Sequence, residues 1–138
     1  MLIKKFEEIK AWQHARNLVR EVYTVSGKGA FAKDFGLKDQ IRRAAGSVMH
    51  NIAEGFDSGS RPGFTRFLRY SQRSATEVMS QLYIALDQGH LTPAQFAKLR
   101  MLADETHATI GGFIKHLQNK KTSGSTADAQ KAPFNAKV

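Results

Sequence analysis

Apolar residues recur every three to four positions along almost the whole chain, and this spacing limits the possible folds more than any other feature. Residues three and four apart share one face of an α-helix, whereas a strand on one face of a sheet alternates every two residues. No segment shows the alternation of a strand. The pattern therefore predicts an all-α protein.

Glycine, proline and capping residues divide the periodic sequence into four expected helices. The first covers about residues 6–25, and the second covers about residues 37–54, where Gly55 is placed to stop it. The third begins at Ser60-Arg61-Pro62, because serine can cap a helix and proline suits its first turn. Gly89 is expected to close that third helix.

The fourth helix has the clearest start, because Thr92-Pro93-Ala94-Gln95 has the form of a capping box. It is expected to run to about Asn119. Gly111-Gly112 interrupts it, at a cost of about 1 kcal/mol for each glycine, so we expect a bend or a close contact there.

The expected core faces follow the same periodicity. The first helix buries Ile9, Trp12, Ala15, Val19, Val22 and Tyr23, and the loop after it contains Phe31 and Phe35. We expect those two phenylalanines to cover one end of the fold. Short connections between long amphipathic helices favour an up-down-up-down four-helix bundle over residues 1–119. Residues 120–138 lack periodicity and are expected to form a disordered basic tail.

The balance of charge is the first indication of function. The 138 residues carry a net charge of +9, and the segment from Lys120 onward holds four lysines and one aspartate, which leaves +6 for the body. Excess positive charge attracts polyanions through a long-range field and through the release of counterions. The alternative is a solvated surface that only keeps the protein soluble.

Three arginines concentrate this charge on the third helix. Arg66, Arg69 and Arg73 share an arc of about 60° almost opposite the expected buried face, and Arg61 comes just before them. Tyr70 lies at the edge of the apolar face, where its ring is available for stacking. Guanidinium groups match phosphates well, so these five residues are the candidate nucleic-acid-binding site. The alternative is an ordinary solvated face.

A polar stripe runs along the second helix beside its apolar face. It spans an arc of about 80° and consists of Gln40, Arg43, Ser47, Asn51 and Glu54. The stripe indicates a subunit interface or a ligand groove, and the alternative is an ordinary boundary face. Ile84 falls on the outward face of the third helix, where an apolar side chain indicates cover by a neighbour.

Catalytic and metal-binding motifs are weak. Asp104 and His107 have ligand spacing, but Asp104 turns away from the expected core and no second copy of the motif is present. His50 and Glu54 lack a third partner. There are no cysteines, no phosphate-binding glycine loop and no nucleophile elbow. We therefore expect no enzymatic activity, metal or cofactor.

The sequence contains neither a signal-peptide pattern nor an apolar run of the roughly 20 residues that cross a bilayer. The expected location is the cytoplasm.

Two segments resemble a known family. Gly36-Leu37-Lys38-Asp39-Gln40-Ile41-Arg42-Arg43-Ala44 and Asn51-Ile52-Ala53-Glu54-Gly55, together with Trp12, resemble the four-helix-bundle proteins encoded in 23S rRNA intervening sequences. The resemblance implies a bundle that assembles into a ring, typically a homopentamer. It also implies a fold related to the accessory variability protein of diversity-generating retroelements, a basic pentamer that binds nucleic acid and a reverse transcriptase. Gln40, Arg43, Asn51 and Glu54 match signature positions, which favours assembly over chemistry.

These observations lead to two hypotheses. The first is a basic oligomeric accessory protein that binds the backbone of RNA or DNA. The second is an interaction scaffold whose oligomer holds a partner protein, such as a reverse transcriptase or a ribosomal component.

Overall fold

The structure is a computed structural model that describes residues 2–122, with side chains as far as Asn119. Its elements are the 3-10 turn η1 (Phe6–Glu8) and the helices α1 (Lys10–Ser26), α2 (Gly29–Lys33), α3 (Phe35–Asp57), α4 (Arg61–Asp87) and α5 (Pro93–Thr122). No strand occurs within the described range. The predicted all-α class is confirmed.

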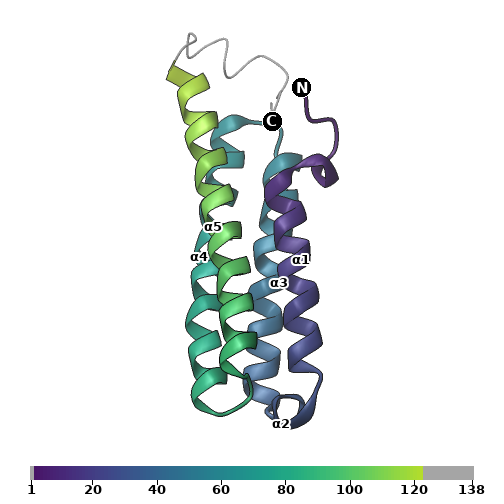
Figure 1. Cartoon of the computed structure of the whole chain (residues 1–138). Coiled ribbons are helices and arrows are strands. Elements are labelled where there is room, and N and C mark those ends of the chain that lie inside the picture. Colours follow the sequence, from purple (N-terminus) through teal and green to yellow (C-terminus); the bar gives the residue numbers. More distant parts are fainter. Residues whose placement is uncertain (1, 123–138) are drawn as a thin grey trace.

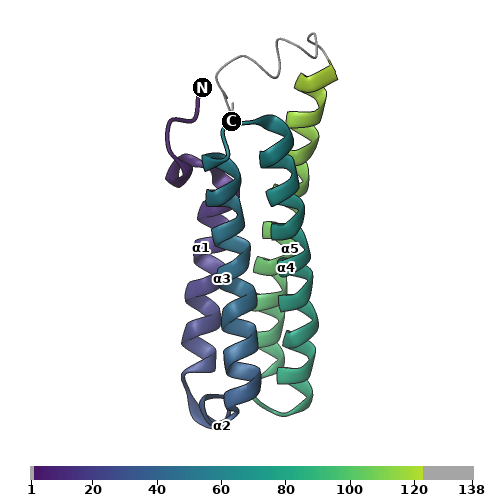
Figure 2. The same cartoon turned by 180° about the vertical axis from the view of Figure 1, so that it is seen from behind.

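The four long helices lie side by side (Figures 1 and 2). Each packs against two others, because α3 contacts α1 and α4 while α5 contacts α4 and α1. The α1–α3 connection, which contains α2, lies at the same end of the molecule as the α4–α5 turn, and the α3–α4 turn lies at the opposite end (Figure 1). Residues 61–73 of α4 therefore lie near the end of the molecule that also holds the end of α5.

The capping signals form the contacts that the sequence predicts. The Ser60 hydroxyl accepts a hydrogen bond from the Gly63 amide at 3.1 Å at the start of α4. Thr92 and Gln95 exchange backbone-to-side-chain hydrogen bonds of 2.9 and 3.1 Å at the start of α5. Gly89 adopts a φ of +75° directly after α4, a conformation that favours glycine. These three predictions are confirmed.

The prediction that Gly55 ends a helix is wrong. Helix α3 continues to Asp57, and Gly55 is buried against α4. A β-carbon at this position would lie 2.8 Å from the Cδ1 atom of Phe64 and 2.8 Å from the Cβ atom of Phe67. Gly55 therefore allows α3 and α4 to approach closely, which a sequence signal for helix ends does not distinguish from a stop.

Helix α3 also begins two residues earlier than predicted. Asp34 caps it by accepting a hydrogen bond from the Leu37 amide at 3.2 Å. The same carboxylate lies 3.0 Å from Nε2 of His90, whose ring stacks on Phe31 with centroids 5.1 Å apart. These contacts tie the α4–α5 turn to the start of α3 and lower the pKa of Asp34, first through His90 and then through the Leu37 amide.

Two of the expected core residues are on the surface. Phe31 is buried in α2 and covers one end of the fold as predicted, but Phe35 is 74% exposed. Tyr23 is 48% exposed, and the guanidinium of Arg42 covers its ring at 4.2 Å. Tyr23 satisfies the helical periodicity near the end of α1 without reaching the interior, and Phe35 is the first residue of α3 rather than part of a loop.

Helix α5 passes through Gly111-Gly112 without a break. A β-carbon on Gly111 would lie 3.0 Å from Nε2 of Gln72, which donates a hydrogen bond to the carbonyl oxygen of His107 at 3.3 Å. The predicted close contact at this position is therefore present.

The interior consists of two apolar clusters, one in each half of the bundle's length. Buried hydroxyls are satisfied by backbone carbonyls: Ser71 donates to Val48 at 2.6 Å and Thr106 donates to Leu102 at 2.7 Å. Among residues 2–122, no helix combines the length and the apolar character that a membrane span needs. The tail predicted at 120–138 lies outside the described residues from position 123, and α5 extends past Asn119 to Thr122.

Candidate nucleic-acid interface

The candidate arginines lie on the first half of α4, which the Ser60 cap holds at its start. Arg66, Arg69 and Arg73 are exposed, and Arg61 is partly buried. Helical geometry places the three exposed side chains on one side of α4, away from the buried face formed by Leu68 and its neighbours.

Three of these arginines line one groove. It has a volume of about 340 Å³ and lies between the start of α4 and the end of α5. Its walls are formed by Arg61, Pro62, Thr65, Arg66, Arg69, Leu117 and Gln118. The groove thus combines guanidiniums with a hydroxyl and an amide, all of which can donate hydrogen bonds to phosphate oxygens.

Arg73 and Tyr70 lie outside this groove and belong to a neighbouring row. The guanidinium of Arg66 lies 5.8 Å from the centroid of the Phe67 ring, and that of Arg73 lies 5.9 Å from the centroid of the Tyr70 ring. The two rings meet edge to face, with centroids 5.9 Å apart. We call Arg66, Phe67, Tyr70 and Arg73 the aromatic–arginine row.

The arginines of this region keep their charge uncompensated by close carboxylates. Within the described residues, neither Arg61 nor any of Arg66, Arg69 and Arg73 forms an ion pair. Glu77, one turn beyond Arg73, accepts a hydrogen bond from Gln81 at 3.3 Å. A guanidinium without a carboxylate partner is free to pair with a phosphate.

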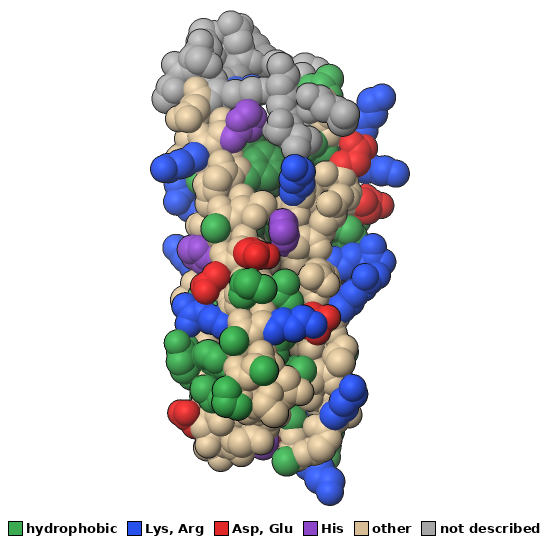
Figure 3. Space-filling view, in the orientation of Figure 1, with side chains coloured by type: hydrophobic (Ala, Val, Ile, Leu, Met, Phe, Trp, Pro, Cys, Tyr) green, Lys and Arg blue, Asp and Glu red, His purple; other side chains and the backbone are tan. Residues whose placement is uncertain are grey.

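The distribution of charge is visible on the molecular surface (Figure 3). Lys and Arg side chains line the upper left edge of that view and most of its right edge, whereas hydrophobic side chains gather at its lower left.

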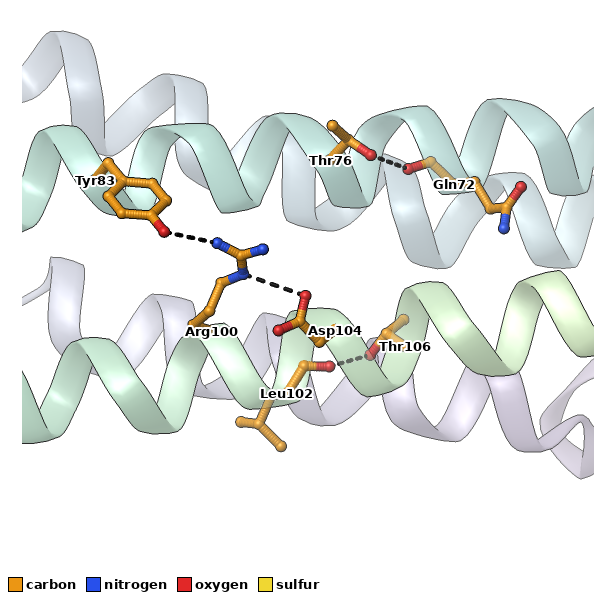
Figure 4. A network of polar contacts seen from close by, with 7 residues as sticks. All are labelled: Gln72, Thr76, Tyr83, Arg100, Leu102, Asp104 and Thr106. Atoms are coloured by element: carbon orange, nitrogen blue, oxygen red, sulfur yellow. Dashed lines mark hydrogen bonds and ion pairs between the residues drawn. The ribbon is translucent and has the colours of Figure 1, made fainter.

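An arginine of α5 that lies beside the second half of α4 already has a carboxylate partner. Arg100, from α5, donates a hydrogen bond to the Tyr83 hydroxyl at 3.0 Å and pairs with Asp104 at 3.2 Å (Figure 4). The Tyr83 ring also packs on Phe96, with centroids 4.9 Å apart. The Asp104 hydrogen bond raises the pKa of Arg100, so this guanidinium stays charged but already has an anionic partner.

Four of the five residues of the predicted polar stripe line a second depression. It has a volume of about 530 Å³ on the outer face of α3 and includes Tyr23, Arg42, Arg43, Gly46, Ser47, His50, Asn51 and Glu54. Gln40 is exposed and does not line it. Gly46 has no side chain to fill the depression, so α3 presents a polar hollow rather than a flat face.

Several groups of the stripe are occupied within the chain. Arg43 pairs with Asp39 at 3.0 Å, one turn away on the same helix. The Asn51 amide donates to the Ser47 carbonyl and hydroxyl, both at 2.9 Å, and the Ser47 hydroxyl lies 2.8 Å from that of Ser74 on α4. Arg43 and Glu54 do not pair with each other.

Ile84 lies apart from the stripe, on α4. It is 47% exposed, and Met101 on α5 is 54% exposed. These apolar side chains lie in the half of the bundle that also holds Arg100.

Asp104 and His107 do not act together. Asp104 binds Arg100, and His107 supplies a backbone carbonyl to Gln72. Within the described residues, no group of three or more histidine and carboxylate side chains is arranged to hold a metal ion.

Sequence analysis missed part of the candidate interface. Phe67 was not among the candidate residues, but it is only partly buried and contacts Arg66 and Tyr70. The position of Phe67 at the edge of the apolar face was the sequence signal that could have indicated its partial exposure. Thr65 and Gln118 gave no signal, because their meeting depends on how α4 and α5 pack.

Comparison with known proteins supports the fold. The sequence model of the family described as "23S rRNA-intervening sequence protein" matches residues 7–112. A crystal structure of a protein with unknown function from the S23 ribosomal protein family of Bacteroides thetaiotaomicron superimposes with a TM-score of 0.69 at 23% identity, covering 76% of this chain and 95% of that one. A search of curated proteins gave no match.

Proposed function

Because the chain belongs to the 23S rRNA-intervening sequence protein family, we propose that it is a non-catalytic, basic, up-down-up-down four-helix bundle that assembles into a homo-oligomer and binds RNA or DNA. The observation that carries the proposal is the set of arginines on α4, namely Arg61, Arg66, Arg69 and Arg73, which have no carboxylate partner among the described residues.

Phosphate is the ligand that this arrangement favours. Guanidinium groups bind phosphate oxygens through paired hydrogen bonds, and a groove lined by Arg61, Arg66 and Arg69 offers several donors at once. The body's net charge of +6 supplies a field that attracts a polyanion before contact. Backbone contacts position a nucleic acid without reading its sequence, so little sequence preference is expected.

Assembly would strengthen this binding. The polar hollow of α3, which includes Arg43, Ser47, Asn51 and Glu54, is the proposed subunit interface, and the family resemblance implies a homopentamer. Several copies of a basic body on one ring place many cations along one nucleic acid, so binding at one subunit raises the effective concentration at the next.

A titration of affinity against salt tests the proposal. Fluorescence anisotropy with generic RNA and DNA probes should show binding at about 50 mM salt that weakens by roughly 100-fold or more by 200 mM, as release of many counterions predicts. Absence of binding at low salt, or affinity independent of salt, would contradict the proposal. Light scattering after gel filtration measures the number of subunits in the same sample.

The second candidate function is a scaffold for a partner protein. It is favoured by the exposed side chains of Tyr83, Ile84 and Met101, which lie away from the basic region. The affinity for a partner bound there would depend little on salt concentration. It would also be unchanged when the α4 arginines are substituted.

A further inference from the structure

We propose that the interface takes an unpaired nucleic-acid strand rather than a duplex, with phosphates on the arginines and a base stacked on the Tyr70 ring. The inference rests on the proposed function and names the form of nucleic acid that the same site accepts. The juxtaposition that carries it is the aromatic–arginine row of Arg66, Phe67, Tyr70 and Arg73.

The row places two aromatic rings between two cations along one helix. Each guanidinium lies about 6 Å from an aromatic centroid, at 5.8 Å for Arg66 on Phe67 and 5.9 Å for Arg73 on Tyr70. The seven steps from Arg66 to Arg73 span about 10 Å of helix. Positive charges combined with aromatic stacking surfaces are the means by which proteins bind single strands without reading their sequence.

Tyr70 is the ring that a base can reach. It is 41% exposed, whereas Phe67 is partly buried where α3 and α4 approach each other at Gly55. Phe67 supports Tyr70 through an edge-to-face contact at an interplanar angle of 87°. The contact with Phe67 therefore restricts the motion of the exposed Tyr70 ring, which lowers the conformational entropy lost when a base stacks on it.

A duplex cannot use this ring. Inside a double helix both faces of each base are covered by its neighbours, so an aromatic side chain finds no free face on which to stack. A duplex would be held by its phosphates alone. An unpaired strand offers the same phosphates and adds the stacking contact, so it should bind more tightly for each phosphate bound.

Tyr83 provides a matched internal comparison. It is 48% exposed and has the guanidinium of Arg100 at 5.7 Å from its ring centroid. Asp104 binds that guanidinium at 3.2 Å, and its carboxylate repels a strand's phosphates. Exposure of a tyrosine next to an arginine is thus present at both places, and of these two arginines Arg73 is the one that forms no ion pair within the described residues.

The test measures fluorescence anisotropy with three probes that carry the same number of phosphates: an oligo-dT strand, an abasic strand and a blunt duplex. The wild-type protein should bind oligo-dT most tightly. Tyr70→Ala should weaken oligo-dT binding about tenfold, which is about 1.4 kcal/mol, and should change abasic-strand binding by less than about twofold. Tyr70→Phe, which keeps the ring, and Tyr83→Ala should both bind oligo-dT as the wild type does.

Two results would overturn the inference: equal wild-type affinity for oligo-dT and the abasic strand, or equal weakening of both by Tyr70→Ala. In either case salt-dependent binding of the abasic strand would leave the proposed function standing. If none of the three probes binds, the proposed function fails together with this inference.

Discussion

In the first half of α4 the guanidinium of Arg73 lies 5.9 Å from the Tyr70 ring, and in the second half that of Arg100 lies 5.7 Å from the Tyr83 ring. Both tyrosines are exposed to a similar extent, at 41% and 48%. The local pairing of cation and ring is thus nearly the same in the two regions.

The carboxylates around the two pairs differ. Asp104, one turn beyond Arg100, binds its guanidinium, whereas no described carboxylate pairs with Arg73 or with Arg66 and Arg69 beside it. The comparison shows that an arginine's capacity to bind a polyanion depends on whether a carboxylate of the protein already pairs with its guanidinium. The distance between arginine and tyrosine alone would assign both regions the same function.

Reversing charge in the first region should have the largest effect. Arg66→Glu/Arg73→Glu removes two phosphate contacts and adds two repulsive charges, so we expect affinity for an RNA strand to fall by about 100-fold or more near 100 mM salt. Anisotropy measures this directly. Arg16→Glu/Arg20→Glu on the exposed side of α1 makes the same change in net charge and should cost much less. Equal losses would mean that net charge alone governs binding.

Adding a methyl group at Gly55, where α3 contacts Phe67 of α4, should have the next largest effect, and this effect is on stability. A β-carbon at Gly55 would lie 2.8 Å from Phe64 and from Phe67, so Gly55→Ala should lower the free energy of unfolding by about 1–3 kcal/mol. Urea denaturation checks this value.

Gly112→Ala is the control for that substitution. Gly112 also lies within a helix, but an added methyl there meets no atom within 4 Å. The alanine should be neutral or stabilise the protein by up to about 1 kcal/mol. If both substitutions have the same effect, Gly55 does not set the distance between α3 and α4.

Freeing Arg100 should make the second region behave more like the first. Asp104→Asn removes its ionic partner and should strengthen binding of an RNA strand about two- to threefold, because a guanidinium and one unit of net charge become available. Glu105→Gln makes the same change in net charge at an exposed residue that forms no ion pair within the described chain. The asparagine variant should bind more tightly than the glutamine variant, and equal affinities would contradict the comparison.

The smallest effect should come from Asp34, which touches neither region. Its pKa is lowered in the folded protein, so its charge stabilises the fold above the ordinary value of 3.8, and this contribution disappears as pH falls through the lowered value. Asp34→Asn keeps a capping side chain and should therefore lower Tm near pH 6, and the difference should disappear as pH falls below the lowered pKa of Asp34. RNA affinity should not change. A Tm difference that persists in acid would show that the carboxylate's charge is not the cause.

The sequence predicts the fold better than the site, and particular residues show why. The Ser60 cap, the Thr92–Gln95 capping box and Gly89 are local signals, and each contact forms between neighbours in the chain. Gly55 also has the local signal of a helix end, but its lack of a side chain allows α3 and α4 to come into contact. The prediction that it ends the helix was therefore wrong.

The site depends on contacts that no local pattern contains. The exposed arc of Arg66, Arg69 and Arg73 follows from helical periodicity, and the structure places all three on the surface. The partner of Arg100 lies four residues away on one helix, a spacing that is readable from sequence, but Tyr83 reaches it from another helix. The ion pair of Arg100 is therefore a local feature, whereas its contact with Tyr83 is set by packing.

The central claim is that the α4 arginines, rather than the overall charge, bind the polyanion. The most direct test compares the dependence of log affinity on log salt for Arg66→Ala/Arg69→Ala/Arg73→Ala with that for Lys10→Ala/Arg16→Ala/Arg20→Ala, which removes three exposed cations from α1. We predict that the α4 variant loses about two to three units of slope and the α1 variant less than about one. Equal slopes for the two variants would contradict the claim.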